Sequence, residues 1–245
     1  MNKLSVLSLI LFILISCEKD NITPINYKTI TLDSVIINNY TQDAKLLYYH
    51  EVFQNPDHPN HNSAVLDTNA INNILKIIQA VYDSAIPESD EVFEKHSIHA
   101  RYCYSFNSVN LRVKPDAPEI RNLAEDLLPT GNDTLDYILT RFNFDSTKLY
   151  YGYPGFPWLT VFFKGEQNMI PVRDNFKQLA MVETAELTSS CIGDGHTIRL
   201  NRSEDEATIV FSIGWGDCPA GCINHKYWKF HVSKNHVKFI GHEPL

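Results

Sequence analysis

The feature that most constrains the fold is a short apolar run near the start of the chain. Residues 4–15 are mostly apolar, a lysine precedes them at position 3, and small and then polar residues follow them. This arrangement is typical of a secretory signal peptide. A membrane-spanning helix needs ~20 apolar residues, so the run is too short to stay in a bilayer as a span. We therefore expect the rest of the chain to fold in an oxidising compartment.

The apolar run ends in Leu14-Ile15-Ser16-Cys17. This sequence resembles the lipobox of bacterial lipoproteins. The resemblance implies that residues 1–16 are a signal peptide and that Cys17 carries a covalent lipid with palmitate-type acyl chains. Several acyl chains on one residue anchor a protein stably, whereas a single chain binds membranes reversibly. The alternative is an ordinary cleaved signal peptide in which the cysteine is incidental.

Glu18-Lys19-Asp20 follow the cysteine directly. They resemble the short Lys/acidic signal that sends some Gram-negative lipoproteins to the outer face of the outer membrane. The resemblance implies an outer-membrane location with exposure at the cell surface. We expect residues 17–26, which are mostly polar, to form a lipidated tether between the membrane and the fold.

Composition restricts the class of protein further. The chain carries 21 Lys and Arg against 29 Asp and Glu, a net charge of −8 at pH 7, and no basic stripe. Such a surface repels phosphate backbones, so nucleic-acid binding is not expected. Hydrophobic residues make up 44% of the chain, as in globular proteins. Beyond Cys17, the even number of cysteines suggests disulfides, with three connectivities open: Cys103, Cys191, Cys218 and Cys222.

The first half of the chain mixes the patterns of helices and strands. Alternating apolar residues predict strands at 27–37 and 46–53. Helical spacing predicts a helix from Asp67 or Thr68 to about residue 82, and a short helix at 89–93. A strand is expected at 101–113. Further helices are expected after Asp116, taken as an N-cap, and after Asn132 or Asp133.

The second half of the chain has a different sequence pattern. Aromatic and β-branched runs with turn residues between them dominate from residue 149 onward. Residues 197–200 and 207–213 predict one hairpin, and 226–232 and 236–240 predict another. The expected fold class is therefore α+β. A mixed helix/strand part at 27–145 precedes a mainly antiparallel β part at 146–245. No strong linker separates the two parts, so the sequence leaves open whether they share one hydrophobic core.

The densest unusual segment is the run of glycines, cysteines and polar residues at 214–225. The first interpretation is a disulfide between Cys218 and Cys222 that closes a tight loop. The second is a metal site in which these thiolates join His225. Its fourth ligand would be one of three residues: Asp217, His196 or His231. The third is a redox-active cysteine pair, which requires a thiolate of low pKa.

An aromatic stretch at 150–158 is the other candidate for binding. Tyr151, Tyr153 and Trp158 would form a stacking platform for a glycan or peptide if their rings were exposed. The competing interpretation is a strand edge that packs into the core. The histidines at 58 and 61 and at 96 and 99 are interpreted as surface residues, because neither pair fits a metal-binding helix.

The sequence contains no Gly-x-Ser-x-Gly elbow, phosphate loop or dinucleotide fingerprint. Enzymatic activity is therefore left open, and a non-catalytic role is favoured. We expect a lipid-anchored outer-membrane protein that binds a glycan or protein ligand or assists the envelope. Its membrane contact is the lipid, and no other cofactor is expected. The alternative is a metal-binding or redox protein that uses Cys218, Cys222 and His225.

Overall fold

The computed structural model of the protein describes residues 27–151, 157–189, 193–234 and 236–245. Its helices are η1 (Tyr27–Thr29), α1 (Ser34–Gln54), α2 (Thr68–Tyr82), α3 (Pro87–Asp90), η2 (Glu91–Lys95, a π-helix), α4 (Pro118–Ala124), α5 (Asp133–Arg141) and α6 (Met169–Phe176). Its strands are β1 (Tyr104–Val113), β2 (Phe144–Tyr151), β3 (Pro157–Phe163), β4 (Val182–Ser189), β5 (Thr197–Arg202), β6 (Glu206–Trp215), β7 (Asn224–Ser233) and β8 (Val237–Gly241). Helices, mostly N-terminal, and antiparallel sheets, mostly C-terminal, confirm the predicted α+β class.

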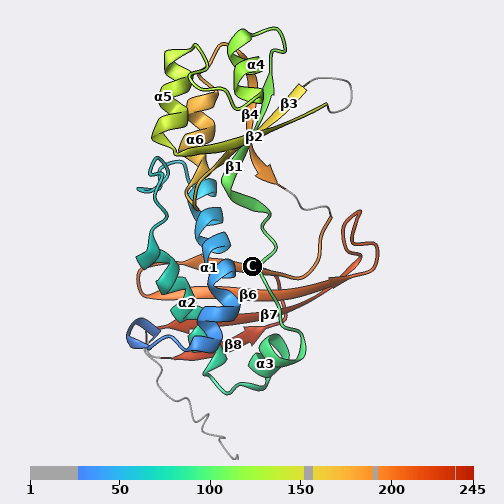
Figure 1. The fold of residues 1–245 in the computed structure, drawn as a ribbon. Coiled ribbons are helices and arrows are strands. Elements are labelled where there is room, and N and C mark those ends of the chain that lie inside the picture. Colours follow the sequence, from blue (N-terminus) through green and yellow to red (C-terminus); the bar gives the residue numbers. More distant parts are fainter. Residues whose placement is uncertain (1–26, 152–156, 190–192, 235) are drawn as a thin grey trace, which may run out of the picture.

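The strands form two four-stranded antiparallel sheets, which lie in two lobes (Figure 1). Sheet β2-β3-β1-β4 packs with α4, α5 and α6 around one hydrophobic core. We call this unit, residues 104–189, the inserted lobe. Sheet β5-β6-β7-β8 packs with α1, α2 and η2 around the other core. The main lobe, residues 27–103 and 193–245, therefore combines the two ends of the described chain.

The lobe boundaries differ from the division expected at residue 145. β1 lies before that position, yet it pairs with β3 and β4, which lie after it. Tyr104 at the start of the inserted lobe is in register with Ser189 at its end. The chain therefore leaves the main lobe and returns to it at neighbouring points.

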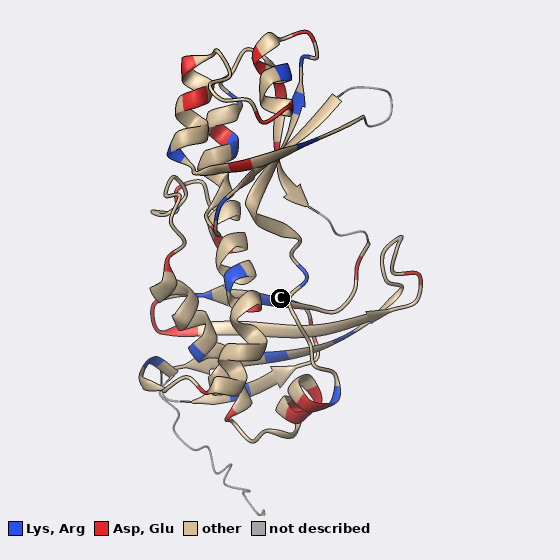
Figure 2. Ribbon diagram, in the orientation of Figure 1, with Lys and Arg blue, Asp and Glu red and all other residues tan. Residues whose placement is uncertain are grey.

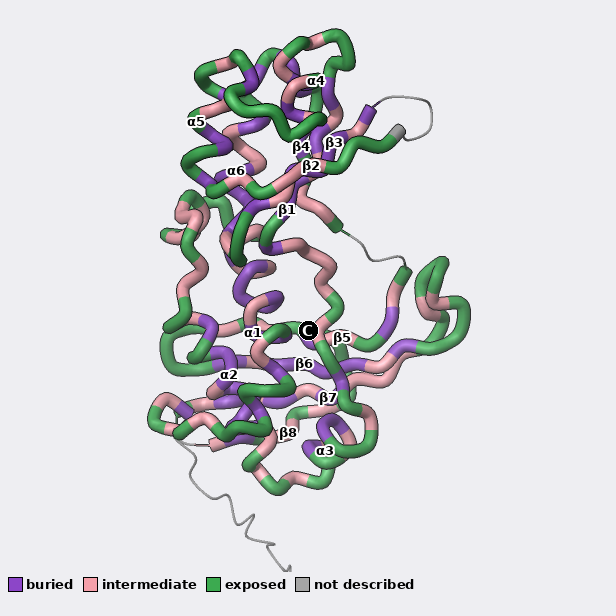
Figure 3. The backbone as a smooth tube through the Cα atoms, in the orientation of Figure 1, coloured by how far each residue is buried: buried purple, intermediate pink, exposed green. Residues whose placement is uncertain are grey.

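Helix α1 overturns the prediction of two strands at 27–37 and 46–53. The helix runs through most of both ranges, and four consecutive residues in it, 46–49, are all buried. Its side chains contact α2, β5 and, through Tyr49, Phe106 of the inserted lobe. Residues 43–53 of the helix are all buried or half-buried, whereas Val35 and Ile37 in its first half are exposed. The helix therefore lacks the regular division into an apolar and a polar face that reveals helical periodicity, and its short apolar runs resemble those of buried strands. Figure 3 shows this burial along α1.

Other local predictions are confirmed where a cap or a turn encodes them. Asp67 caps α2 by accepting the backbone N–H groups of Asn69 and Ala70. Asn132 caps α5, and both expected hairpins form as β5–β6 and β7–β8. Asp116 was expected to cap α4 and does not. That helix begins at Pro118, whose ring already restricts φ to a helical value, without a side-chain cap.

Helix α6 was not expected, because only strands were predicted after residue 149. It is short and has Pro171 in its first turn, so it shows little helical periodicity. Its start depends on Asn168, a buried N-cap that accepts the Ile170 N–H. The Asn168 amide also donates to three backbone oxygens of the main lobe: those of Asn60, His61 and Ser63. A contact with a distant segment therefore positions this helix.

Two further findings concern the membrane and the charges. No helix in the described part of the chain is long and apolar enough to cross a bilayer. The predicted signal peptide, Cys17 and the predicted tether lie outside the described residues. Lys and Arg are scattered over both lobes among acidic residues and form no continuous stripe on the described ribbon (Figure 2).

Candidate functional site

The candidate site lies at the loop that joins β6 to β7 in the main lobe. The predicted disulfide is present: Cys218 and Cys222 are bonded, with their Cα atoms 3.9 Å apart. Gly214 allows the loop to close against the strand, since a Cβ there would lie 2.5 Å from Cys222 Sγ. Cys103 also belongs to a disulfide.

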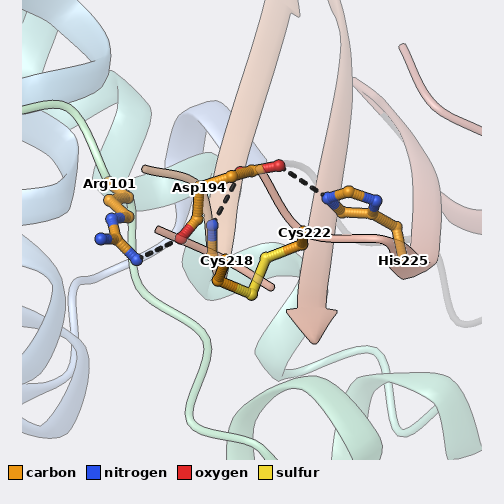
Figure 4. The surroundings of a disulfide bond; sticks show 6 residues. Arg101, Asp194, Cys218, Cys222 and His225 are labelled. Carbon is orange, nitrogen blue, oxygen red and sulfur yellow. Dashed lines mark hydrogen bonds and ion pairs between the residues drawn. A yellow bond between two sulfur atoms is a disulfide. The ribbon is translucent and has the colours of Figure 1, made fainter. Parts of the chain in front are cut away.

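Asp194 connects this loop to the segment that precedes β5 (Figure 4). Its backbone N–H donates to the Cys218 oxygen at 2.8 Å, and its own backbone oxygen accepts from Arg101 Nη1 at 2.6 Å. Its carboxylate lies 2.8 Å from His225 Nε2 and accepts the Gly195 N–H at 2.7 Å. The hydrogen bond from Gly195, and then that with His225, lowers the pKa of Asp194, so the carboxylate is ionised at neutral pH.

The structure brings together only part of the predicted metal site. The ligand atoms of Asp194, Cys222 and His225 all lie within 4.8 Å of one another. The acidic group within reach is thus Asp194, not the Asp217 offered by the sequence. His231 faces Thr208 farther along the hairpin. While the disulfide is intact, the cysteine sulfurs are not thiolates and do not act as metal ligands.

A pocket of about 490 Å³ opens beside the disulfide loop. It lies between residues 97–101, the segment around Asp194, and the start of the loop. Most of its exposed lining is apolar, and the side chains around it include Ser97, His99, Arg101, Asp194, His196 and Cys218. The hollow is shallow and open to solvent, and its volume is in the range of small-molecule sites, which use a few convergent polar groups to orient a ligand.

His99 is held at the pocket by a buried carboxylate. Asp43 on α1 is only 4% exposed, lies 2.9 Å from His99 Nδ1 and accepts the Ala100 N–H through a short hydrogen bond. Burial raises the pKa of Asp43, although the hydrogen bonds from His99 and Ala100 oppose this effect. The imidazole also stacks on Tyr40, with 4.9 Å between ring centroids. Nδ1 is therefore engaged, which leaves Nε2 as the ring nitrogen for a ligand.

The histidines interpreted as surface residues differ in their surroundings. His99 has half of its side chain exposed, yet Asp43 and Tyr40 fix its orientation. His58 contradicts the prediction, because only 15% of its side chain is exposed. Its ring packs edge-on against Tyr48.

The described residues do not support the predicted aromatic platform of Tyr151, Tyr153 and Trp158 as one exposed surface. Tyr153 and the side chain of Tyr151 lie outside the described residues. Trp158 is half-buried on β3, where it is in register with Arg112 and Tyr150. Strand β3, which carries it, lies in the inserted lobe, whereas β6 and β7, which the disulfide loop joins, lie in the main lobe (Figure 1).

Asp43, Arg101 and Asp194 were not identified as site residues from the sequence. Asp43 lay in an unrecognised helix, and 56 residues separate it from His99. The one usable signal was the Asp194-Gly195-His196 turn close to a cysteine. No protein-family model, curated protein or solved structure matches this chain.

Proposed function

We propose that this protein is a lipoprotein of a Gram-negative outer membrane, anchored through Cys17, that binds a hydroxyl-rich ligand such as a glycan. The observation that carries the binding role is the open pocket beside the disulfide loop, which has a few polar side chains around it. Its His99 imidazole, Arg101 guanidinium and Asp194 carboxylate offer both donors and acceptors. Sugar hydroxyls both donate and accept hydrogen bonds, so they match such a lining.

The orientation of these groups supports binding more than it supports a reaction. Asp43 fixes His99, and backbone hydrogen bonds hold Asp194 and Arg101 in place. A lining held in place before the ligand arrives loses less conformational entropy on binding. The lipid anchor and the acidic surface favour a role at the cell envelope and disfavour nucleic acid.

The anchor is tested by Cys17→Ser in the full chain expressed in a Gram-negative host. The wild-type protein should incorporate labelled palmitate and fractionate with detergent-soluble membranes. The variant should lose the label and enter the soluble fraction, because serine does not accept the thioether-linked lipid. Ser16→Ala is the matched control, since it keeps a small residue before the cysteine and should stay anchored. Unchanged fractionation of Cys17→Ser would contradict the proposal.

The pocket is tested by His99→Ala, with binding measured calorimetrically against a panel of cell-wall and host-type oligosaccharides. Loss of a positioned hydrogen bond should weaken binding about tenfold, or about 1.4 kcal/mol. His242→Ala is the control, because this exposed histidine does not line the pocket. Equal affinity of wild type and His99→Ala would exclude the pocket as the binding site. Turnover of any panel member would exclude a purely non-catalytic role.

A second candidate function is metal or redox chemistry at Cys218, Cys222 and His225. The close approach of Asp194, Cys222 and His225 favours it. Because the disulfide and a metal compete for the same sulfur atoms, this candidate depends on the oxidation state of the loop.

A further inference from the structure

We infer that reduction of the Cys218–Cys222 disulfide converts the loop into a zinc site, with both thiolates, His225 and Asp194 as ligands. This inference rests on the second candidate function and deepens it. It does not depend on which ligand occupies the pocket. Two sulfurs, one imidazole nitrogen and one carboxylate oxygen form a donor set that zinc accepts in tetrahedral geometry.

The distances are close to what such a site requires. Zinc bonds of 2.0–2.3 Å place neighbouring ligand atoms of a tetrahedron about 3.3–3.8 Å apart. Ligand atoms of Asp194, Cys222 and His225 lie within 4.8 Å of one another, and Cys218 Sγ is bonded to Cys222 Sγ. Asp194 and His225 are now 2.8 Å apart, so they need to separate by roughly half an ångström. The ion would then replace the hydrogen bond between them.

The framework of the loop does not depend on the disulfide alone. Pairing of β6 with β7 brings Gly214 opposite His225, so this strand register fixes the position of the imidazole. The Asp194 N–H to Cys218 oxygen bond and the Arg101 to Asp194 bond hold the facing segment. Breaking the sulfur–sulfur bond leaves these contacts in place, so the four ligands stay near one another.

Solvent access and charge also favour the site. The Asp194 side chain is 43% exposed and that of His225 is 23% exposed, so a metal ion and a reductant can reach the loop. The Asp194 carboxylate and two cysteines that become thiolates when they bind a metal would supply three anionic ligands. A divalent cation compensates the charge repulsion that the three anionic groups would otherwise experience.

The chemistry is a two-electron exchange followed by metal binding. A dithiol donates two electrons and two protons to the disulfide, which becomes two thiols while the dithiol becomes a disulfide. Zn²⁺ then binds both sulfurs and displaces two protons to solvent. The two sulfurs cannot form a disulfide and bind zinc at the same time, so zinc occupancy reports the redox state of the cysteines.

The test uses the full chain in detergent, treated with dithiothreitol, freed of reductant without oxygen, and titrated with Zn²⁺. Native mass spectrometry should show one zinc ion per reduced chain and none per oxidised chain. Co²⁺ in its place should give the absorption of a tetrahedral site with thiolate ligands.

His225→Ala and Asp194→Asn test the two ligands that are not cysteines. Each should weaken zinc binding at least about a hundredfold, since loss of a group that only orients a ligand already costs ~10–100-fold. His242→Ala is the matched control for histidine loss and should bind zinc as wild type does. Circular dichroism verifies that each variant is folded.

Three outcomes would overturn the inference. The reduced protein could bind no zinc, which would leave at most a redox role for the loop. His225→Ala and Asp194→Asn could both bind zinc normally. Alkylation could show that dithiothreitol does not open the Cys218–Cys222 bond in the folded protein. Glycan binding is measured on the oxidised, metal-free protein, so its failure is distinguishable from all three.

Discussion

Replacing Trp228 by alanine is expected to lower the free energy of unfolding of the main lobe by about 4 kcal/mol, within the usual range for a buried tryptophan. The side chain is fully buried on β7, in register with Phe211 of β6. Its removal leaves a large cavity between the sheet and η2, and a close-packed core relaxes only partly around such a void.

Polar contacts add to this loss. Trp228 Nε1 donates to Glu91 Oε2 at 2.8 Å, and the same carboxylate lies 2.6 Å from Lys226 Nζ. Lys226 also lies over the indole ring, 4.4 Å from its centroid. The ring therefore connects the sheet to the π-helix that contains Glu91. Alanine removes the packing and the hydrogen bond together.

Urea denaturation followed by far-ultraviolet circular dichroism measures the effect without relying on tryptophan fluorescence. Trp215→Ala is the matched control, because this tryptophan is 49% exposed at the end of β6 and its loss should cost less than about 0.5 kcal/mol. If the lobes unfold in separate transitions, only the transition of the main lobe should shift. Equal effects of the two substitutions would show that Trp228 is not packed as described.

A fragment of residues 27–145 is expected not to fold cooperatively. It contains β1 without its partners β3 and β4, and it contains α1 and α2 without the sheet that they cover. Both hydrophobic cores would then be exposed to water over much of their surface. The expected result is a collapsed or unfolded chain with poor dispersion in a two-dimensional NMR spectrum.

A fragment of residues 104–189 is the matched comparison and is expected to fold. It holds all four strands of the first sheet, three covering helices and its own core. The pairing of Tyr104 with Ser189 brings its ends together. It should be less stable than in the full chain, because Asn168 loses its bonds to the main lobe. A well-dispersed spectrum from 27–145, or none from 104–189, would contradict this division of the chain.

The elements that the sequence predicted correctly depend on neighbours along the chain. Asp67 lies directly before α2, Asn132 directly before α5, and four positions separate Cys218 from Cys222. Caps, turns and short disulfide loops are stabilised by contacts within a few residues. A reader of the sequence alone can therefore infer them from spacing.

The candidate site was only partly predictable. Cys218, Cys222 and His225 stand close together in the sequence, so their proximity in space followed directly. The Asp43–His99 and Asp194–His225 pairs join residues 56 and 31 positions apart. The arrangement of α1 against the main-lobe sheet, and of the segment before β5 against the disulfide loop, brings them together.

The sequence by itself determined the α+β class, the two C-terminal hairpins and the disulfide loop, because alternation, turn residues and cysteine spacing act locally. The tertiary structure alone decided that residues 34–54 form a helix, since burial of its second half and exposed apolar residues in its first half remove the periodic pattern. It also decided that 104–189 form an inserted lobe, because strand partners are selected by long-range packing. The pocket beside the disulfide loop exists only as a result of that packing, since its lining comes from segments that meet across the fold.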